Sequence, residues 1–149
     1  MSSSELNAIA NQWFAAFNGK DLDRLLALYD DQAEHFSPKL KVRHPETNGL
    51  IKGKDALRGW WQDAFYRLPT LRYEAIRLTP FEDRVFMEYV RHVKDETDLY
   101  IGEMLEIRWT DRQIKRISSV THALLIFLKN SGSSGNKPKS AALSCAGRK

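Results

Sequence analysis

The apolar residues of this chain change their spacing at Pro69, and this change limits the folds that the chain can adopt. Before Pro69 they recur at helical spacing, most clearly over 54–68, where one wide apolar face is followed by the proline that ends the helix. After Pro69 they follow the alternating spacing of strands. Helices first and antiparallel strands afterwards predict an α+β domain with the helices on one face of a curved sheet.

Two more helices are expected near the N-terminus. The first covers the apolar series Leu6–Phe17 and ends at Asn18-Gly19, because glycine tolerates the left-handed cap. The second is short, with Asp21 as its cap and a buried stripe that extends to Tyr29. A brief strand over 30–38 follows, and the segment 39–53 is expected to be a loop or an irregular hairpin.

Four antiparallel strands are expected after Pro69. The first, over 71–79, changes phase after Ala75, which predicts a β-bulge. The second, over 84–94, has apolar residues on both faces, and the last two form a hairpin through Asp111-Arg112. The apolar run Ala123–Leu128 suits a sixth strand at a dimer interface or over a cavity; the alternative is a short buried end packed on the first helix.

The net charge of +4 belongs to the last twenty residues, which hold four basic residues and no acidic one. The remaining chain has 19 basic and 19 acidic residues. We therefore expect one neutral domain over 1–129 and a disordered basic tail, rich in Ser, Gly and Lys, over 130–149. The domain has no basic stripe with interleaved aromatic residues, so no nucleic-acid partner is expected for it; a contact through the tail is the alternative.

The sequence lacks several motifs that would indicate a cellular location or a type of chemistry. The first residues lack a secretory signal, and the longest apolar run is far too short to span a membrane. The lone Cys145 cannot form an internal disulfide, so we expect a cytoplasmic protein. The four histidines show no metal-binding spacing, and the sequence lacks a phosphate loop, a nucleophile elbow and a CxxC motif. No metal site is expected.

Two histidines are candidates for chemistry. His122, at the end of the last polar strand, is either a general base or hydrogen-bond donor at a cavity mouth, or a strand-end histidine bonded to backbone or water. His92 can pair with Glu103 or Glu106 on the neighbouring strand, but we favour a solvent-facing or dimer-facing position for it.

The two acids of the strand over 99–110 point to opposite faces. Glu106 shares its face with Met104, and Glu103 shares its face with Ile101 and Leu105. If the second face is the core, an unpaired glutamate on it would be costly, and Glu103 would then be the more informative acid. The sequence does not determine which face of this strand points inward.

Aromatic residues are the candidates for the wall of a pocket. Most of an aromatic stripe at helical spacing is expected to be core. The adjacent Trp60 and Trp61 lie about 100° apart around the helix axis, so that one can pack on the sheet while the other borders a cavity.

The chain resembles the SnoaL-like branch of the nuclear transport factor 2-like superfamily. The segments that carry this resemblance are "WFAAFNGKDLDRLLALYDDQAE", "GLIKGKDALRGWW" and "GEMLEIRWTDRQIKRISSVTH". It implies a cone in which three helices close one side of a strongly bent antiparallel sheet around an apolar cavity. It also implies that His35 lies where this family lines its pocket, with a solvated loop histidine as the alternative. Many relatives have an acid where this chain has His122.

The resemblance extends to function, since its members include ketosteroid isomerases, polyketide cyclases, epoxide hydrolases, dehydratases and binding modules. We expect a homodimer that binds a small apolar molecule and, if catalytic, transfers a proton without a cofactor, with His122 as the base and His35, Tyr29 or a buried glutamate as its partner. The alternative is a non-catalytic binding or dimerisation module. The residues expected to bind the ligand are Trp13, Phe17, Trp60, Trp61, Phe65, Met104 and Glu106.

Overall fold

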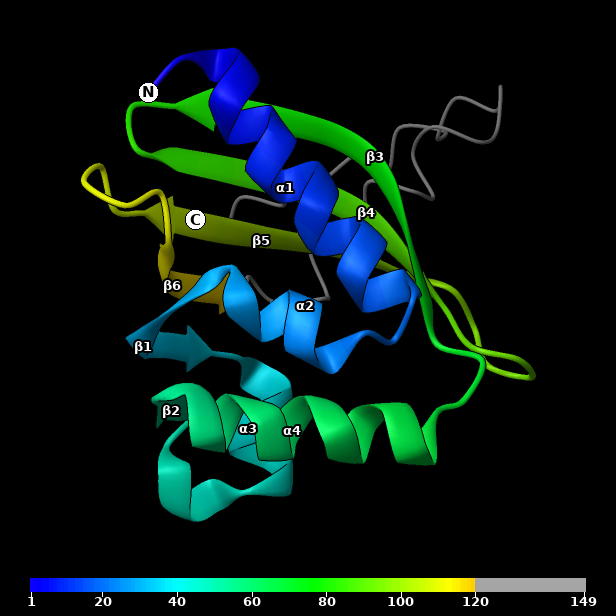
Figure 1. Ribbon diagram of the computed structural model, residues 1–149. Helices are drawn as coiled ribbons and strands as arrows, with labels where there is room; N and C mark the ends of the chain where they lie inside the picture. The colour runs from blue at the N-terminus through cyan, green and yellow to red at the C-terminus, as the bar shows by residue number, and fades with distance from the viewer. Residues whose placement is uncertain (120–149) are drawn as a thin grey trace, which may run out of the picture.

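The computed structural model describes residues 1–119, which form a bent sheet with helices on one side (Figure 1). The helices are α1 (Ser3–Asn18), α2 (Leu22–Ala27), α3 (Pro38–Arg43), the 3₁₀ helix η1 (Pro45–Thr47) and α4 (Lys54–Arg67). The strands are β1 (Tyr29–Phe36), β2 (Leu50–Lys52), β3 (Arg72–Phe81), β4 (Arg84–His92), β5 (Leu99–Ile107) and β6 (Ile114–Ser119).

The six strands lie in the order β2-β1-β6-β5-β4-β3. The four strands after Pro69 pair antiparallel in sequence order, as predicted. The β3–β4 register shifts between Ala75 and Arg77, which confirms the predicted bulge. β1 pairs parallel with β6, a feature that the sequence analysis did not anticipate, because a strand pattern does not reveal its partner.

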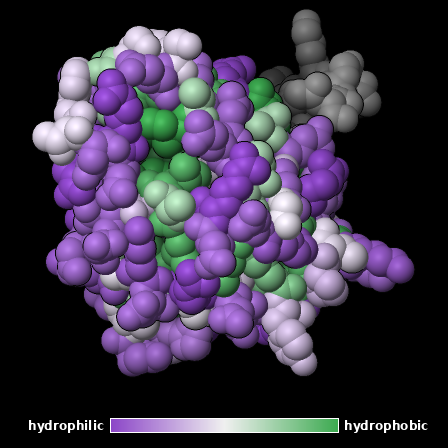
Figure 2. All heavy atoms as spheres, in the orientation of Figure 1, coloured by the Kyte–Doolittle hydropathy of each residue, from purple (hydrophilic) through white to green (hydrophobic). Residues whose placement is uncertain are grey.

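The helices cover the concave side of the sheet in two groups. α1 crosses β3 and β4, while α4 runs beside β1 and β2, with α2 between the two longer helices (Figure 1). Most of the face that Figure 2 shows is hydrophilic, and hydrophobic residues gather there in a narrow strip alongside α1. The apolar faces of the helices therefore point into the space above the sheet. Within residues 1–119, no helix is both long and apolar enough to cross a membrane.

Two predicted local structures need correction. Tyr29 was predicted in the buried stripe of α2, but α2 ends at Ala27 and Tyr29 begins β1, opposite Ile114. The sheet takes this segment because the Ile114 amide donates to the Leu28 carbonyl at 2.8 Å. The segment 39–53 is more ordered than predicted: Ser37 caps α3 with Pro38 at its start, and β2 pairs with β1.

The core between α1 and the sheet is a stack of aromatic rings. Phe17 stacks on Tyr73 with ring centroids 4.0 Å apart, and Tyr73 lies 4.4 Å from Tyr89. Trp13 stacks on Phe17 at 5.3 Å and is completely buried. This stack fills the space beneath α1, so the space that remains open lies beside it, under α3 and α4.

Candidate functional site

A cavity of about 370 Å³ lies between α3, α4 and the concave side of the sheet. Its volume falls within the range of small-molecule sites. Its apolar wall comes from Trp60, Trp61, Ala64, Leu68, Leu71 and Ile101. Its polar wall comes from His35, Lys39, Tyr73, Tyr89, Arg91, Glu103 and Ser119. The polar residues lie on β1, α3 and the four strands after Pro69, so the cavity gathers distant parts of the sequence.

Glu103 is the acid of this cavity. β5 turns Ile101, Glu103, Leu105 and Ile107 inward, and Glu103 is only 4% exposed. Burial raises the pKa of Glu103, while the nearby Ser119 and Tyr89 hydroxyls act in the opposite direction. Ser119 Oγ donates to Glu103 Oε1, but Oε2 has no hydrogen-bond partner within residues 1–119. A buried carboxyl oxygen without a partner is energetically costly unless a ligand supplies one.

His35 lines the same cavity from β1, and its exposed fraction is 1%. Burial lowers the pKa of His35 to about 3, so the imidazole is neutral near neutral pH. Its Nδ1 has no hydrogen-bond partner among the described residues. The ring contacts Trp61 at 5.2 Å between centroids. His35 is therefore a buried neutral group and not a solvated loop histidine.

The candidate aromatic residues separate into two groups. Trp60 and Trp61 line the cavity, and the indole Nε1 of Trp61 is buried without a partner in the described part of the chain. Trp13, Phe17 and Phe65 do not line it. Trp13 and Phe17 belong to the aromatic stack of the core, and Phe65 packs at its edge, with the Lys20 amine 5.1 Å from its ring centre.

Tyr29 lies away from the cavity, although it was a candidate partner for the catalytic base. It is completely buried, and its hydroxyl accepts a hydrogen bond from Trp13 Nε1 at 2.8 Å. Burial raises the pKa of Tyr29 well above its usual range. Its position follows from its place as the first residue of β1, where it contacts Trp13 of α1.

Met104 and Glu106 lie on the opposite face of β5 from the cavity, because successive side chains of a strand alternate. Both are half-buried. Glu106 is the register partner of Arg84 on β4 and Arg116 on β6. The structure thus places Glu103, and not Glu106, in the position expected for the ligand-facing acid.

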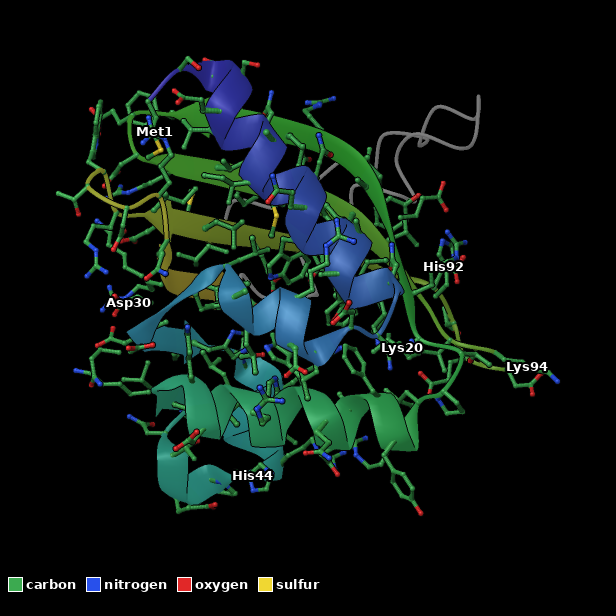
Figure 3. The ribbon with its side chains drawn as sticks, in the orientation of Figure 1. Met1, Lys20, Asp30, His44, His92 and Lys94 are labelled. Carbon is green, nitrogen blue, oxygen red and sulfur yellow. The ribbon has the colours of Figure 1, made fainter. Side chains whose placement is uncertain are left out.

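The other described histidines do not line the cavity; Figure 3 labels His92, at the end of β4, and His44, which follows α3. His92 Nδ1 is 2.8 Å from Asp98 Oδ1, and His92 Nε2 is 2.7 Å from Glu74 Oε2. These partners replace the glutamates of β5 considered from the sequence. His44 Nδ1 lies 3.4 Å from Glu46 Oε1, where the chain passes from α3 to η1.

His122 lies outside the described residues, as do Ala123–Leu128 and the tail over 130–149. The role of His122 as a base therefore stays a prediction. Within residues 1–119, no group of three or more His, Cys, Asp or Glu side chains could hold a metal ion.

Sequence reasoning missed the basic side chains of the cavity wall, among them Arg91 and Lys39. Arg91 continues the inward series Val85, Met87 and Tyr89 along β4, so strand alternation could have revealed it. Lys39 lies in the segment predicted as a loop, and only the formation of α3 brings it to the cavity. No pattern in the sequence marks Lys39.

Comparison with known proteins agrees with this geometry. Residues 10–120 match the SnoaL-like domain family. The chain belongs to the SnoaL-like family. No curated protein matches the chain.

Solved structures with the same fold carry several descriptions. A SnoaL-like protein of unknown function from Burkholderia thailandensis is 24% identical, with a TM-score of 0.72 over 80% of this chain and 95% of that chain. A protein assigned as a ketosteroid isomerase from Kribbella flavida is 19% identical, with a TM-score of 0.63 over 78% of this chain and 76% of that chain. A protein assigned as a polyketide cyclase from Sinorhizobium meliloti is 18% identical, with a TM-score of 0.65 over 80% and 100%. At these identities the likeness establishes the α+β cone fold of this SnoaL-like chain.

Proposed function

We propose that this SnoaL-like protein binds a small, largely apolar molecule in the cavity and transfers a proton on it without a cofactor. One observation carries the proposal. Among residues 1–119, four buried side-chain polar atoms lack a hydrogen-bond partner, and three of them belong to cavity-lining residues: His35 Nδ1, Trp61 Nε1 and Glu103 Oε2. Buried, unpaired polar atoms on residues that line one cavity are the expected signature of a binding site.

Glu103 is the group of this set that is suited to proton transfer. Its raised pKa makes it a stronger base than an exposed carboxylate and brings its titration nearer to neutral pH. Trp61 can donate its indole N–H to a ligand oxygen, and neutral His35 can donate or accept. Isomerisation, dehydration and cyclisation all begin with such a transfer. His122 keeps its proposed role as a second base.

A neutral test substrate can separate catalysis from binding. 5-Nitrobenzisoxazole opens when a base removes its C3 proton and the N–O bond breaks, which gives a coloured cyanonitrophenolate without any cofactor. We expect the protein to accelerate this elimination and the Glu103→Gln variant to lose at least about 100-fold in kcat/KM, because a positioned base contributes that much. The wild-type rate should rise with pH around a midpoint above 4.5, since burial raises the pKa of Glu103 and only its ionised form accepts the proton.

The matched control is Glu106→Gln, on the same strand but the opposite face. It should leave the rate unchanged. Equal losses in the two variants would show that the reaction does not occur in this cavity. Binding of 5-nitrobenzisoxazole without elimination would instead support the alternative, a non-catalytic binding module.

We also propose that the protein forms the homodimer expected from its sequence. Phe81 and Phe86 lie on the sheet face that points away from the helices, and Phe81 is highly exposed. Exposed aromatic side chains on a sheet face suit contact with a second copy. The cytoplasmic location stays a prediction.

A further inference from the structure

The charges on the cavity wall are unbalanced. Its lining contains four basic side chains, Lys39, Arg43, Arg67 and Arg91, against one acidic side chain, Glu103. A cavity that binds a neutral apolar molecule does not require an excess of basic side chains. Because the folded domain as a whole is close to neutral, the excess is a local property of this site.

The carboxylates around the cavity do not remove the imbalance. Asp63 forms ion pairs with two arginines of the cavity lining, at 2.7 Å from Arg67 and 3.7 Å from Arg43. Arg91 pairs with Glu96 at 2.8 Å. Within residues 1–119, no carboxylate oxygen lies within the 4.0 Å of an ion pair from the Lys39 amine.

Lys39 and Arg91 approach the cavity from opposite layers, α3 and β4. The Arg91 side chain is only 9% exposed. Burial and, to a smaller extent, the charge of Arg91 lower the pKa of Lys39 to about 8, while the charges of Glu103 and Glu96 act in the opposite direction. Lys39 is half-buried and, unlike Arg91, has no ion-pair partner among residues 1–119, so an anion bound beside the two cations would offset their mutual repulsion.

Glu103 does not take the place of that anion. It forms no ion pair with Lys39 or Arg91 within 4.0 Å, so its attraction for Lys39 acts at longer range. The apolar residues Leu68, Leu71 and Ile101 leave room for an apolar body beside the two cations.

We infer that the ligand of this cavity is an apolar acid whose carboxylate, or equivalent anionic group, is held between Lys39 and Arg91. The inference rests on the proposed function, which requires binding in the cavity but sets no charge on the ligand. It narrows the ligand class to anions with an aromatic or aliphatic body. Charge-assisted hydrogen bonds to both cations would supply the selectivity.

Two probes of nearly equal shape test the inference by isothermal titration calorimetry at pH 7. They are 2-naphthoate, which carries a carboxylate, and 2-naphthamide, which is neutral. We expect the wild-type protein to bind 2-naphthoate at least about tenfold more tightly, the difference typical of a hydrogen bond to a charged group. In Lys39→Gln this preference should fall to about threefold or less, and Lys39→Arg should retain it.

Lys41→Gln is the matched control, because it removes the same charge from an exposed position of α3 that does not line the cavity. Equal affinity of the wild-type protein for both probes would overturn the inference and leave the proposed function intact. An equal loss in Lys39→Gln and Lys41→Gln would also overturn it, because the preference would then reflect overall charge. Failure of both probes to bind would count against the proposed function and the inference together.

Discussion

Trp13→Ala is expected to lower the free energy of unfolding by about 3 to 5 kcal/mol, the range for removal of a buried aromatic side chain. Trp13 is completely buried and contacts the rings of Phe14, Phe17, Trp61, Tyr73 and Tyr89. Its loss also leaves the buried Tyr29 hydroxyl without its donor. Since single domains have a total stability of about 5 to 15 kcal/mol, the variant should unfold at a much lower urea concentration.

The control for this change is Trp109→Ala, because Trp109 is 60% exposed. Its effect should stay within about 0.5 kcal/mol. Urea unfolding followed by far-ultraviolet circular dichroism measures both variants. A loss below about 1 kcal/mol in Trp13→Ala would contradict the role of the aromatic stack as the core of the domain.

The second large effect is a loss of stability in acid that depends on His35. Burial lowers the pKa of His35 from 6.5 to about 3, so the folded state holds the ring neutral. The unfolded chain takes up the proton near pH 6.5, and His35 therefore contributes stability that is present above pH 6.5 and is lost as the pH falls towards 3. Between pH 7.5 and pH 4.5 this single group should remove about 2 to 3 kcal/mol.

Replacement of the ring by a group that does not titrate isolates this effect. Between pH 7.5 and pH 4.5, the free energy of unfolding should fall by about 2 to 3 kcal/mol less in His35→Leu and His35→Gln than in the wild-type protein. This difference does not depend on how stable each variant is at pH 7.5. Urea unfolding at four pH values in this interval gives the slope of the free energy of unfolding against pH for each protein. Parallel slopes for the wild-type and variant proteins would mean that His35 is exposed to water in the folded state.

Local patterns predicted the elements whose periodicity is long and regular. α1, α4 and the four strands after Pro69 follow directly from the spacing of apolar residues, and the bulge follows from the phase change after Ala75. The parallel β1–β6 pairing and the short helix α3 did not follow. Both depend on which segments meet in space, and short elements gain their stability from such tertiary contacts more than from their own propensity.

Some residues of the cavity could be predicted from the sequence, but their arrangement could not. Strand alternation showed that only one of Glu103 and Glu106 could face inward, and the fold selects Glu103. His35 and Trp61 reach the cavity as expected, whereas Tyr29 serves the core. Lys39 could not be found from the sequence, since an isolated lysine in a loop-like segment has no signature until α3 forms.

The central claim is that the space between α3, α4 and the sheet receives a small molecule beside Glu103. Filling that space tests it most directly. Ala64 is buried on α4 and lines the cavity, whereas Gln62, two residues earlier, is exposed and does not line it. Ala64→Phe should therefore occupy the site, and Gln62→Phe adds the same ring outside it.

Native mass spectrometry in the presence of 2-naphthoate, repeated with 2-naphthamide, provides the measurement. The wild-type protein and Gln62→Phe should each carry one bound probe molecule per chain, and Ala64→Phe should carry none while it keeps its circular dichroism spectrum. Binding to Ala64→Phe at the wild-type level, with either probe, would contradict the claim.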